Sequence, residues 1–74
     1  MKYRCCADKC NSKAKNLITW HITSIQGELR CNTHTPSLTY NESWTIVPAT
    51  EENIIEYILA GKKIYELDKA KWPS

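Results

Sequence analysis

Two short segments carry all four cysteines of this chain: Cys5-Cys6-Ala7-Asp8-Lys9-Cys10 and Cys31-Asn32-Thr33-His34. The first segment reads Cys-x4-Cys when counted from Cys5, or Cys-x3-Cys when counted from Cys6, and the second reads Cys-x2-His. Zinc prefers four tetrahedral sulfur and nitrogen ligands, and small domains usually supply them as two closely spaced pairs. One tight turn presents both ligands of such a pair, so the pattern predicts a structural zinc site.

Two disulfides are the alternative use of four cysteines, and they are typical of small secreted domains. The N-terminal sequence lacks the apolar stretch of a signal peptide, which favours a reducing cytoplasm and therefore zinc. The spacing alone leaves open whether Cys5 or Cys6 is the ligand. His21 has no closely spaced ligand partner, so we expect a hydrogen-bonded or exposed histidine there.

The order of these segments resembles a known arrangement. The relevant residues are Cys5-x4-Cys10, then Ala14, an extended apolar stretch, and Gly27-Glu28-Leu29-Arg30-Cys31-x2-His34. Over about residues 5–36 they are similar to small treble-clef-type zinc fingers, which are common in phage and bacterial genomes. The resemblance implies a cysteine knuckle, a β-hairpin and a closing Cys-x2-His pair. With Cys6 as the substitute for the first ligand, it implies the ligand set Cys5, Cys10, Cys31 and His34.

The chain departs from that family in two places. A second cysteine stands beside the first, and Pro36 stands where a helix would normally continue from the closing histidine. These departures concern the identity of the first ligand and the structure that follows the last one.

The chain is short for a self-sufficient core. Its 74 residues make one domain, with a zinc-binding knuckle and hairpin over 1–36 and a strand, helix and tail over 37–74. Five Leu, eight Ile and one Val, with no Phe, are available for the interior. A chain of this size buries roughly 60% of its unfolded surface and usually needs a metal, disulfides or a partner subunit. Zinc meets that need, and a homodimer would add to it.

Strand signals surround the second ligand pair. The pattern predicts a strand over 17–25, a turn at Gln26-Gly27, a returning strand over 28–31, a loop over 37–43 and a third strand over 44–47. The returning strand delivers Cys31 and His34 to the knuckle. Pro48 stops the third strand, because proline has no N–H for a sheet ladder.

The C-terminal half predicts an amphipathic helix. Thr50 is a good N-cap residue, and Glu51 and Glu52 suit the positive end of a helix. Four apolar residues then repeat with helical spacing and predict one apolar stripe: Ile54, Ile55, Ile58 and Leu59.

The end of this helix is also marked. Gly61 suits the position after the last helical residue, and Lys62 and Lys63 suit the negative helix end. Residues 64–67 predict either a final strand or a continued helix, and residues 69–74 predict a tail. The predicted fold is therefore α+β: a small zinc-stabilised domain with a cysteine knuckle, a β-hairpin plus a third strand, and one C-terminal amphipathic helix.

Aromatic and acidic residues favour a protein–protein interaction module. Three Trp and four Tyr are many aromatic residues for so small a core. We expect Trp20 and Trp44 to fill the core. The acidic start of the helix suits a basic groove, such as one that normally holds DNA. The predicted partner-binding residues are Glu51, Glu52, Glu56 and Trp72.

The resemblance also implies a role for the chain. Small fingers of the phage type often bind and inhibit a host machine, so it implies a phage early protein acting in the host cytoplasm. Its partner would be a host DNA-replication or transcription factor whose DNA-binding surface it occupies. No apolar run is long enough to span a membrane. Four ligands leave zinc no open coordination position, so we do not expect an enzyme.

A nucleic-acid-binding zinc finger is the alternative function. The formal charge is +2, and five basic residues against Asp8 alone concentrate positive charge in the N-terminal face: Lys2, Arg4, Lys9, Lys13 and Lys15. Clustered cations can contact phosphates. The chain lacks the spacing of Cys2His2 fingers and a basic recognition helix, so protein binding ranks first.

Overall fold

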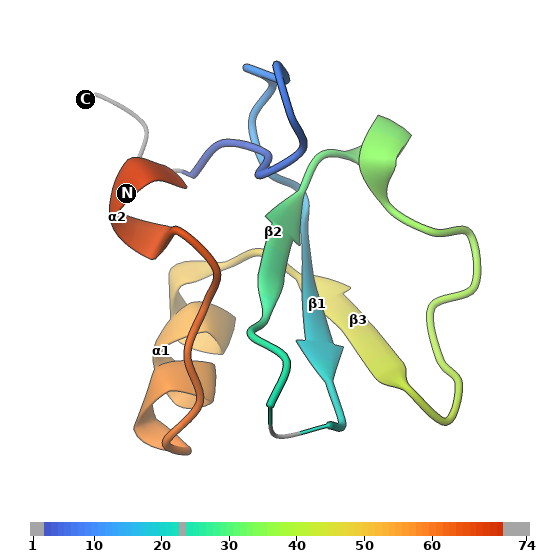
Figure 1. Ribbon diagram of the computed structural model, residues 1–74, viewed down its shortest axis with the longest axis vertical. Helices are drawn as coiled ribbons and strands as arrows, with labels where there is room; N and C mark the ends of the chain where they lie inside the picture. Colours follow the sequence, from blue (N-terminus) through green and yellow to red (C-terminus); the bar gives the residue numbers. More distant parts are fainter. Residues whose placement is uncertain (1–2, 23, 71–74) are drawn as a thin grey trace.

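The computed structural model describes residues 3–22 and 24–70. Three strands form one antiparallel sheet in the order β2-β1-β3, and a helix, α1, lies against one of its faces (Figure 1). In chain order the elements are β1 (Asn16–Trp20), β2 (Glu28–Arg30), the 3₁₀ helix η1 (Asn32–His34), β3 (Trp44–Pro48), α1 (Glu51–Leu59) and α2 (Leu67–Ala70). The predicted combination of a β-hairpin, a third strand and a helix is confirmed, and the four-residue α2 is an addition to it.

The register of the sheet places the core. Leu17 in β1 lies opposite Leu29 in β2 and Val47 in β3. Side chains alternate along a strand, so these three point to the same face of the sheet. Leu17 and Leu29 are completely buried there, in one cluster with Ile54 and Tyr57 of α1. The core is therefore a single layer between sheet and helix.

The opposite face of the sheet carries Ile18 and two tryptophans. Ile18 is only 2% exposed. The rings of Trp20 and Trp44, a paired position in the register, meet edge to face with centroids 5.0 Å apart. Both tryptophans are half-buried and lie outside the main cluster. They therefore shield the far face of the sheet and do not fill the core between sheet and helix.

The predicted strand over 17–25 is wrong beyond Trp20, where β1 ends. Ile22 is exposed in a turn, closed by the Ile25 N–H, which donates to the Ile22 carbonyl oxygen at 3.1 Å. Gly27 then bonds to the segment after α1, its N–H donating to the Lys63 carbonyl oxygen at 2.8 Å. The predicted turn at Gln26-Gly27 is wrong as well, because the chain reverses before Gln26 and Gly27 pairs with the segment after α1.

The predicted apolar stripe of the helix is wrong in part. α1 buries Ile54 and Tyr57, whereas the other three residues of the predicted stripe are exposed: Ile55 by 54%, Ile58 by 41% and Leu59 by 80%. Residues three apart lie on one side of a helix, and the large Tyr57 ring takes the inner position beside Ile54. Ile55 and Leu59, four apart, therefore share the outward side.

Thr50 caps α1 as predicted, because its hydroxyl oxygen accepts a hydrogen bond from the Asn53 N–H at 3.1 Å. We expect Thr50→Ala to lower the free energy of unfolding by about 1 kcal/mol, which for a domain of this size is roughly 4–8 °C in melting temperature. Ser37→Ala, which removes an exposed loop hydroxyl, is the control and should shift the melting temperature by less than about 2 °C. Equal shifts in circular-dichroism melts would contradict the capping role.

The chain after α1 matches neither prediction for residues 64–67. Gly61, with a φ of 84°, follows the helix end as predicted. Ile64 then forms a single parallel bridge to Gly27, which ties this segment to the outer edge of the hairpin. Residues 69 and 70 of the predicted tail belong to α2, and residues 71–74 lie outside the described residues. A contact with the sheet, and not local propensity, therefore shapes this segment.

Candidate metal centre

The N-terminal knuckle brings Cys5 and Cys10 together. The Cys5 N–H donates to the Ser12 carbonyl oxygen at 2.8 Å, and the Cys10 N–H donates to the Ala7 carbonyl oxygen at 3.1 Å. Lys9 adopts the left-handed conformation, with a φ of 60°, that closes a tight turn. Local hydrogen bonds within one turn thus set the first pair of sulfurs.

The 3₁₀ helix η1 presents the second pair directly after β2. The His34 N–H and the Thr35 hydroxyl both donate to the Cys31 carbonyl oxygen, at 3.1 and 2.7 Å. This turn places His34 Nδ1 3.2 Å from Cys31 Sγ. The chain leaves η1 in an extended conformation at Thr35, as expected for the residue before Pro36.

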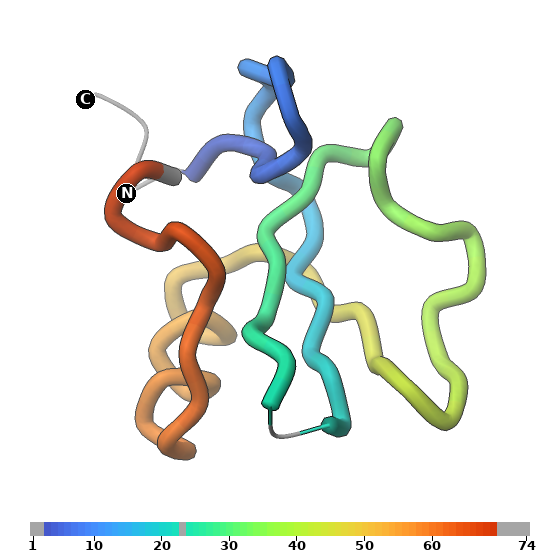
Figure 2. Tube along the Cα trace, viewed as in Figure 1, coloured from blue at the N-terminus to red at the C-terminus, as the bar shows by residue number. Residues whose placement is uncertain are grey.

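Backbone hydrogen bonds hold the knuckle beside the second pair. The Cys6 N–H donates to the Leu29 carbonyl oxygen at 2.8 Å, and the Lys15 N–H donates to the Arg30 carbonyl oxygen at 2.9 Å. Figure 2 shows the result: the knuckle, in blue, and the turn after β2, in green, lie at the same end of the sheet. The sheet therefore brings together two pairs that are far apart in the sequence.

One ligand atom from each of Cys5, Cys10, Cys31 and His34 lies within 4.8 Å of the others. The sulfurs of Cys10 and Cys31 are 3.8 Å apart, and the Cys5 sulfur is 3.6 Å from His34 Nδ1. Zinc with bonds of about 2.3 Å to sulfur and about 2.0 Å to nitrogen has tetrahedral edges of about 3.8 and 3.5 Å between these ligands. The cluster could therefore hold a metal ion, with Nδ1 as the histidine ligand atom.

None of the four cysteines forms a disulfide. The separation of 3.8 Å between the Cys10 and Cys31 sulfurs is far above the length of a disulfide, about 2.05 Å. A hydrogen bond from the Ser12 backbone lowers the pKa of the Cys10 thiol to about 7, whereas burial raises the pKa of Cys5. Metals bind cysteine as the thiolate, so the lowered pKa of Cys10 favours its metal-binding form and the raised pKa of Cys5 disfavours it.

Cys6 lies outside the cluster. Its sulfur is 3.9 Å from Glu28 Oε2, and burial raises the pKa of its thiol. Glu28 also accepts a hydrogen bond from the Trp20 indole at 3.1 Å and pairs with Arg30 at 2.7 Å. Of the two adjacent cysteines, Cys5 is the one that the structure brings to the other ligands.

No pattern in the sequence signals the network around Glu28, because Cys6, Trp20 and the β2 residues come from three separate segments.

The other residues singled out in the sequence lie elsewhere. His21 is hydrogen-bonded as predicted, with Nδ1 3.1 Å from the Glu42 carbonyl oxygen and Nε2 2.8 Å from the Thr45 hydroxyl. The predicted partner-binding residue Trp72 lies outside the described residues. Its companions are all exposed on α1: Glu51, Glu52 and Glu56.

Comparisons with protein-family models, with curated proteins and with solved structures find no match for this chain. The resemblance to treble-clef-type fingers therefore stays a prediction. Within the described residues, no helix combines the length and the apolar character that crossing a membrane requires. Fold and site together define the class: a small domain with a three-stranded antiparallel sheet and a cluster of three cysteines and one histidine that could hold a metal.

Proposed function

We propose that the cluster binds zinc and that the zinc is structural. Four ligand atoms complete a tetrahedron, which leaves no position for a substrate. Within residues 3–22 and 24–70, the main cluster of the core holds five buried residues, so the interior is small. A metal that joins the knuckle to the end of β2 supplies stability that so small a core does not.

We further propose that the domain is a protein–protein interaction module. The observation that carries this proposal is the outer face of α1, which we define as Glu51, Glu52, Ile55, Glu56 and Leu59. Its two apolar side chains are more than half exposed, although the chain has few apolar residues to spare for the surface. Apolar side chains grouped on one exposed helix side and flanked by charges are typical of a docking surface.

The charges of this face indicate the chemistry of the partner. Three carboxylates flank the apolar pair, so a matching surface is basic with an apolar strip. A protein surface that normally holds DNA is basic, and the carboxylates would take the place of phosphates there. A host replication or transcription factor as the target, and inhibition as the outcome, remain predictions that rest on the resemblance.

One observation favours the nucleic-acid alternative. Lys9, Lys13 and Lys15 are exposed around the knuckle, where they could contact phosphates. Asp8, also exposed, belongs to the same N-terminal segment and reduces its net positive charge. We therefore keep this function as the second candidate, and the experiment that follows separates the two.

A photo-cross-linking amino acid at position 59 tests the module. In lysate of the cells that make the protein, we expect cross-links to protein that survive nuclease treatment. Substituting Glu52 and Glu56 by Lys in the same chain should reduce the yield of these cross-links roughly tenfold, because the flanking charges then repel a basic partner. The same amino acid at Asn11, exposed in the knuckle, is the control. Cross-links from Asn11 alone, and lost with nuclease, would favour the nucleic-acid function.

A further inference from the structure

The second ligand pair lies on a turn that is weak by itself. The His34 N–H donates to the Cys31 carbonyl oxygen at 3.1 Å, and the Thr35 N–H donates to the Asn32 carbonyl oxygen at 3.4 Å. Hydrogen bonds in 3₁₀ turns have poorer geometry than those of an α-helix. Within residues 3–22 and 24–70, none of the three residues of η1 is buried, and Cys31 at its N-cap makes no side-chain capping bond. Burial and capping therefore do not fix this turn.

The chain after η1 does not extend the turn. Thr35 is extended, with a φ of −91° and a ψ of 131°, and Pro36 follows it. A helix does not continue through such a pair, because the residue before a proline avoids the helical region and proline has no N–H. His34 is thus the last residue of a single turn, and its position depends on a contact with another segment.

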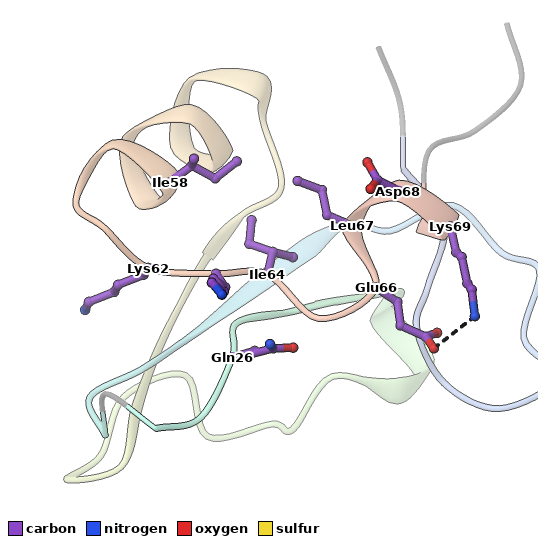
Figure 3. Close-up of a pocket in the computed structure, with 9 residues that line it drawn as sticks. Gln26, Ile58, Lys62, Ile64, Glu66, Leu67, Asp68 and Lys69 are labelled. Atoms are coloured by element: carbon purple, nitrogen blue, oxygen red, sulfur yellow. Dashed lines mark ion pairs between the residues drawn. The ribbon is translucent and has the colours of Figure 1, made fainter.

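α2 lies beside the first ligand pair. Glu66 and Lys69 line a hollow of about 220 Å³ together with Cys5 and Cys6 of the knuckle. The two charges pair with each other at 3.5 Å, along the dashed line in Figure 3. Both side chains are exposed, so this ion pair contributes little stability. The support for the second ligand pair comes from β1.

Asn16, the first residue of β1, reaches both ends of η1 with its side-chain amide. Nδ2 donates to Asn32 Oδ1 at 2.9 Å and to Thr35 Oγ1 at 3.2 Å. The Thr35 hydroxyl in turn donates to the Cys31 carbonyl oxygen at 2.7 Å, which is the oxygen that also accepts from the His34 N–H. A continuous chain of hydrogen bonds therefore runs from the sheet to the turn that carries both ligands.

Asn16 is itself held from both sides. It belongs to the central strand, where it lies opposite Arg30 of β2 and Pro48 of β3. The neighbouring Lys15 N–H donates to the Arg30 carbonyl oxygen at 2.9 Å, and the Ala49 N–H donates to the Lys15 carbonyl oxygen at 3.0 Å. Side chains on rigid elements position a site more precisely than side chains on loops do. The amide of Asn16 is therefore a fixed point from which η1 is held.

We propose that Asn16 and Thr35 are positioning residues that hold Cys31 and His34 ready for the metal and so determine how tightly it binds. The inference rests on the proposed zinc site, because it names residues that act on that site without touching the ion. Ligands that are in place before the metal arrives lose less freedom on binding. Outer hydrogen-bond partners of metal ligands typically contribute about 10- to 100-fold to metal affinity. We expect the lower end of that range, since these bonds act on the backbone of the turn.

Substitutions of Thr35 and Asn16 test the chain of hydrogen bonds. Thr35→Val keeps the shape of the side chain but removes the hydroxyl, and it should weaken Zn²⁺ binding by the full chain roughly tenfold, measured by competition with a chelating dye. Thr35→Ser keeps the hydroxyl and should stay within about threefold of the wild type. Asn16→Ala should also weaken binding roughly tenfold. The double variant Asn16→Ala/Thr35→Val should lose less than the product of the two single effects, because both residues act through the same bonds.

Thr19→Val is the matched control. The Thr19 hydroxyl donates to the Thr45 carbonyl oxygen, so this variant also loses a side-chain hydrogen bond of β1, but one that does not lead to η1. Its zinc affinity should stay within about threefold of the wild type.

The visible absorption spectrum of the Co²⁺-loaded protein is a readout that general destabilisation does not move, because it reports the geometry of the ligands around the ion. At saturating Co²⁺, Thr19→Val and Thr35→Ser should reproduce the wild-type bands. Thr35→Val and Asn16→Ala should shift them, since the second ligand pair is then less fixed. A variant that unfolds without metal, as circular dichroism of the metal-free chain shows, is compared through this spectrum alone.

Two results would overturn the inference. One is an unchanged zinc affinity and an unchanged Co²⁺ spectrum in both Asn16→Ala and Thr35→Val. The other is a loss of affinity that Thr19→Val or Thr35→Ser matches. If the wild type binds zinc and either result is found, the zinc site stands and only the positioning role is wrong. If the wild type binds neither Zn²⁺ nor Co²⁺, the proposed zinc site fails and the inference fails with it.

Discussion

Cys31→Ser should lower the stability of the zinc-loaded protein by at least about 3 kcal/mol, or about 15 °C in melting temperature, whereas Cys6→Ser should change it by less than about 1 kcal/mol. Cys31 is buried and its sulfur lies 3.8 Å from that of Cys10 and 3.2 Å from His34 Nδ1, so its loss removes one corner of the tetrahedron. The Cys6 sulfur faces Glu28 instead. Substitution by serine keeps the size of each side chain similar, so the difference between the two variants reports metal binding.

Chelation and mass measurement provide the controls for this comparison. EDTA should lower the melting temperature of the wild type and of Cys6→Ser. It should leave the melting temperature of Cys31→Ser almost unchanged, because the Cys31→Ser variant has already lost its metal. Native mass spectrometry should find one zinc per chain with all cysteines reduced. Equal destabilisation by the two substitutions would mean that Cys6 is a ligand. A metal-free chain lighter by four hydrogen atoms would mean two disulfides in place of zinc.

Gly27→Ala should destabilise the domain by about 3 kcal/mol, the second-largest effect that we expect. A Cβ at this position would lie 2.6 Å from Cε2 and 2.9 Å from Cζ of the Tyr57 ring. The ring is 7% exposed within the core and has little room to move. The glycine backbone is also held, since its N–H donates to Lys63 and its carbonyl oxygen accepts from the Tyr65 N–H at 2.7 Å.

The other glycine of the chain is the matched control for this prediction. A Cβ at Gly61 meets no atom within 4 Å, but the φ of 84° makes alanine unfavourable there by about 1 kcal/mol. The free energies of unfolding of the two variants, measured in urea, should therefore differ by about 2 kcal/mol. In a Tyr57→Leu background, Gly27→Ala should lower the free energy of unfolding by less than about 1 kcal/mol, because the clashing ring is gone. A cost that does not change in that background would contradict the close approach of ring and glycine.

The sequence predicts well those features that a few neighbouring residues create. The spacing within each ligand pair is local, and each pair is indeed presented by a single turn. Thr50 caps α1 and Gly61 follows its end, because caps depend on hydrogen bonds and backbone angles within one helical turn. β1 and β3 exist as their β-branched and aromatic residues predict, although β1 is shorter than predicted, whereas β2 (Glu28–Arg30) contains no such residue.

Tertiary contacts decide the features that local patterns leave open. Cys5 rather than Cys6 joins the cluster because the Cys6 N–H is bonded to Leu29 of β2, which orients the knuckle. α1 turns Tyr57 inward and leaves Leu59 outside because only a glycine, Gly27, lies where the ring packs. Residue spacing determines which groups can share a turn or a helix side. Which of the possible sides faces inward depends on the shape of a distant segment, and only the folded chain brings that segment into contact.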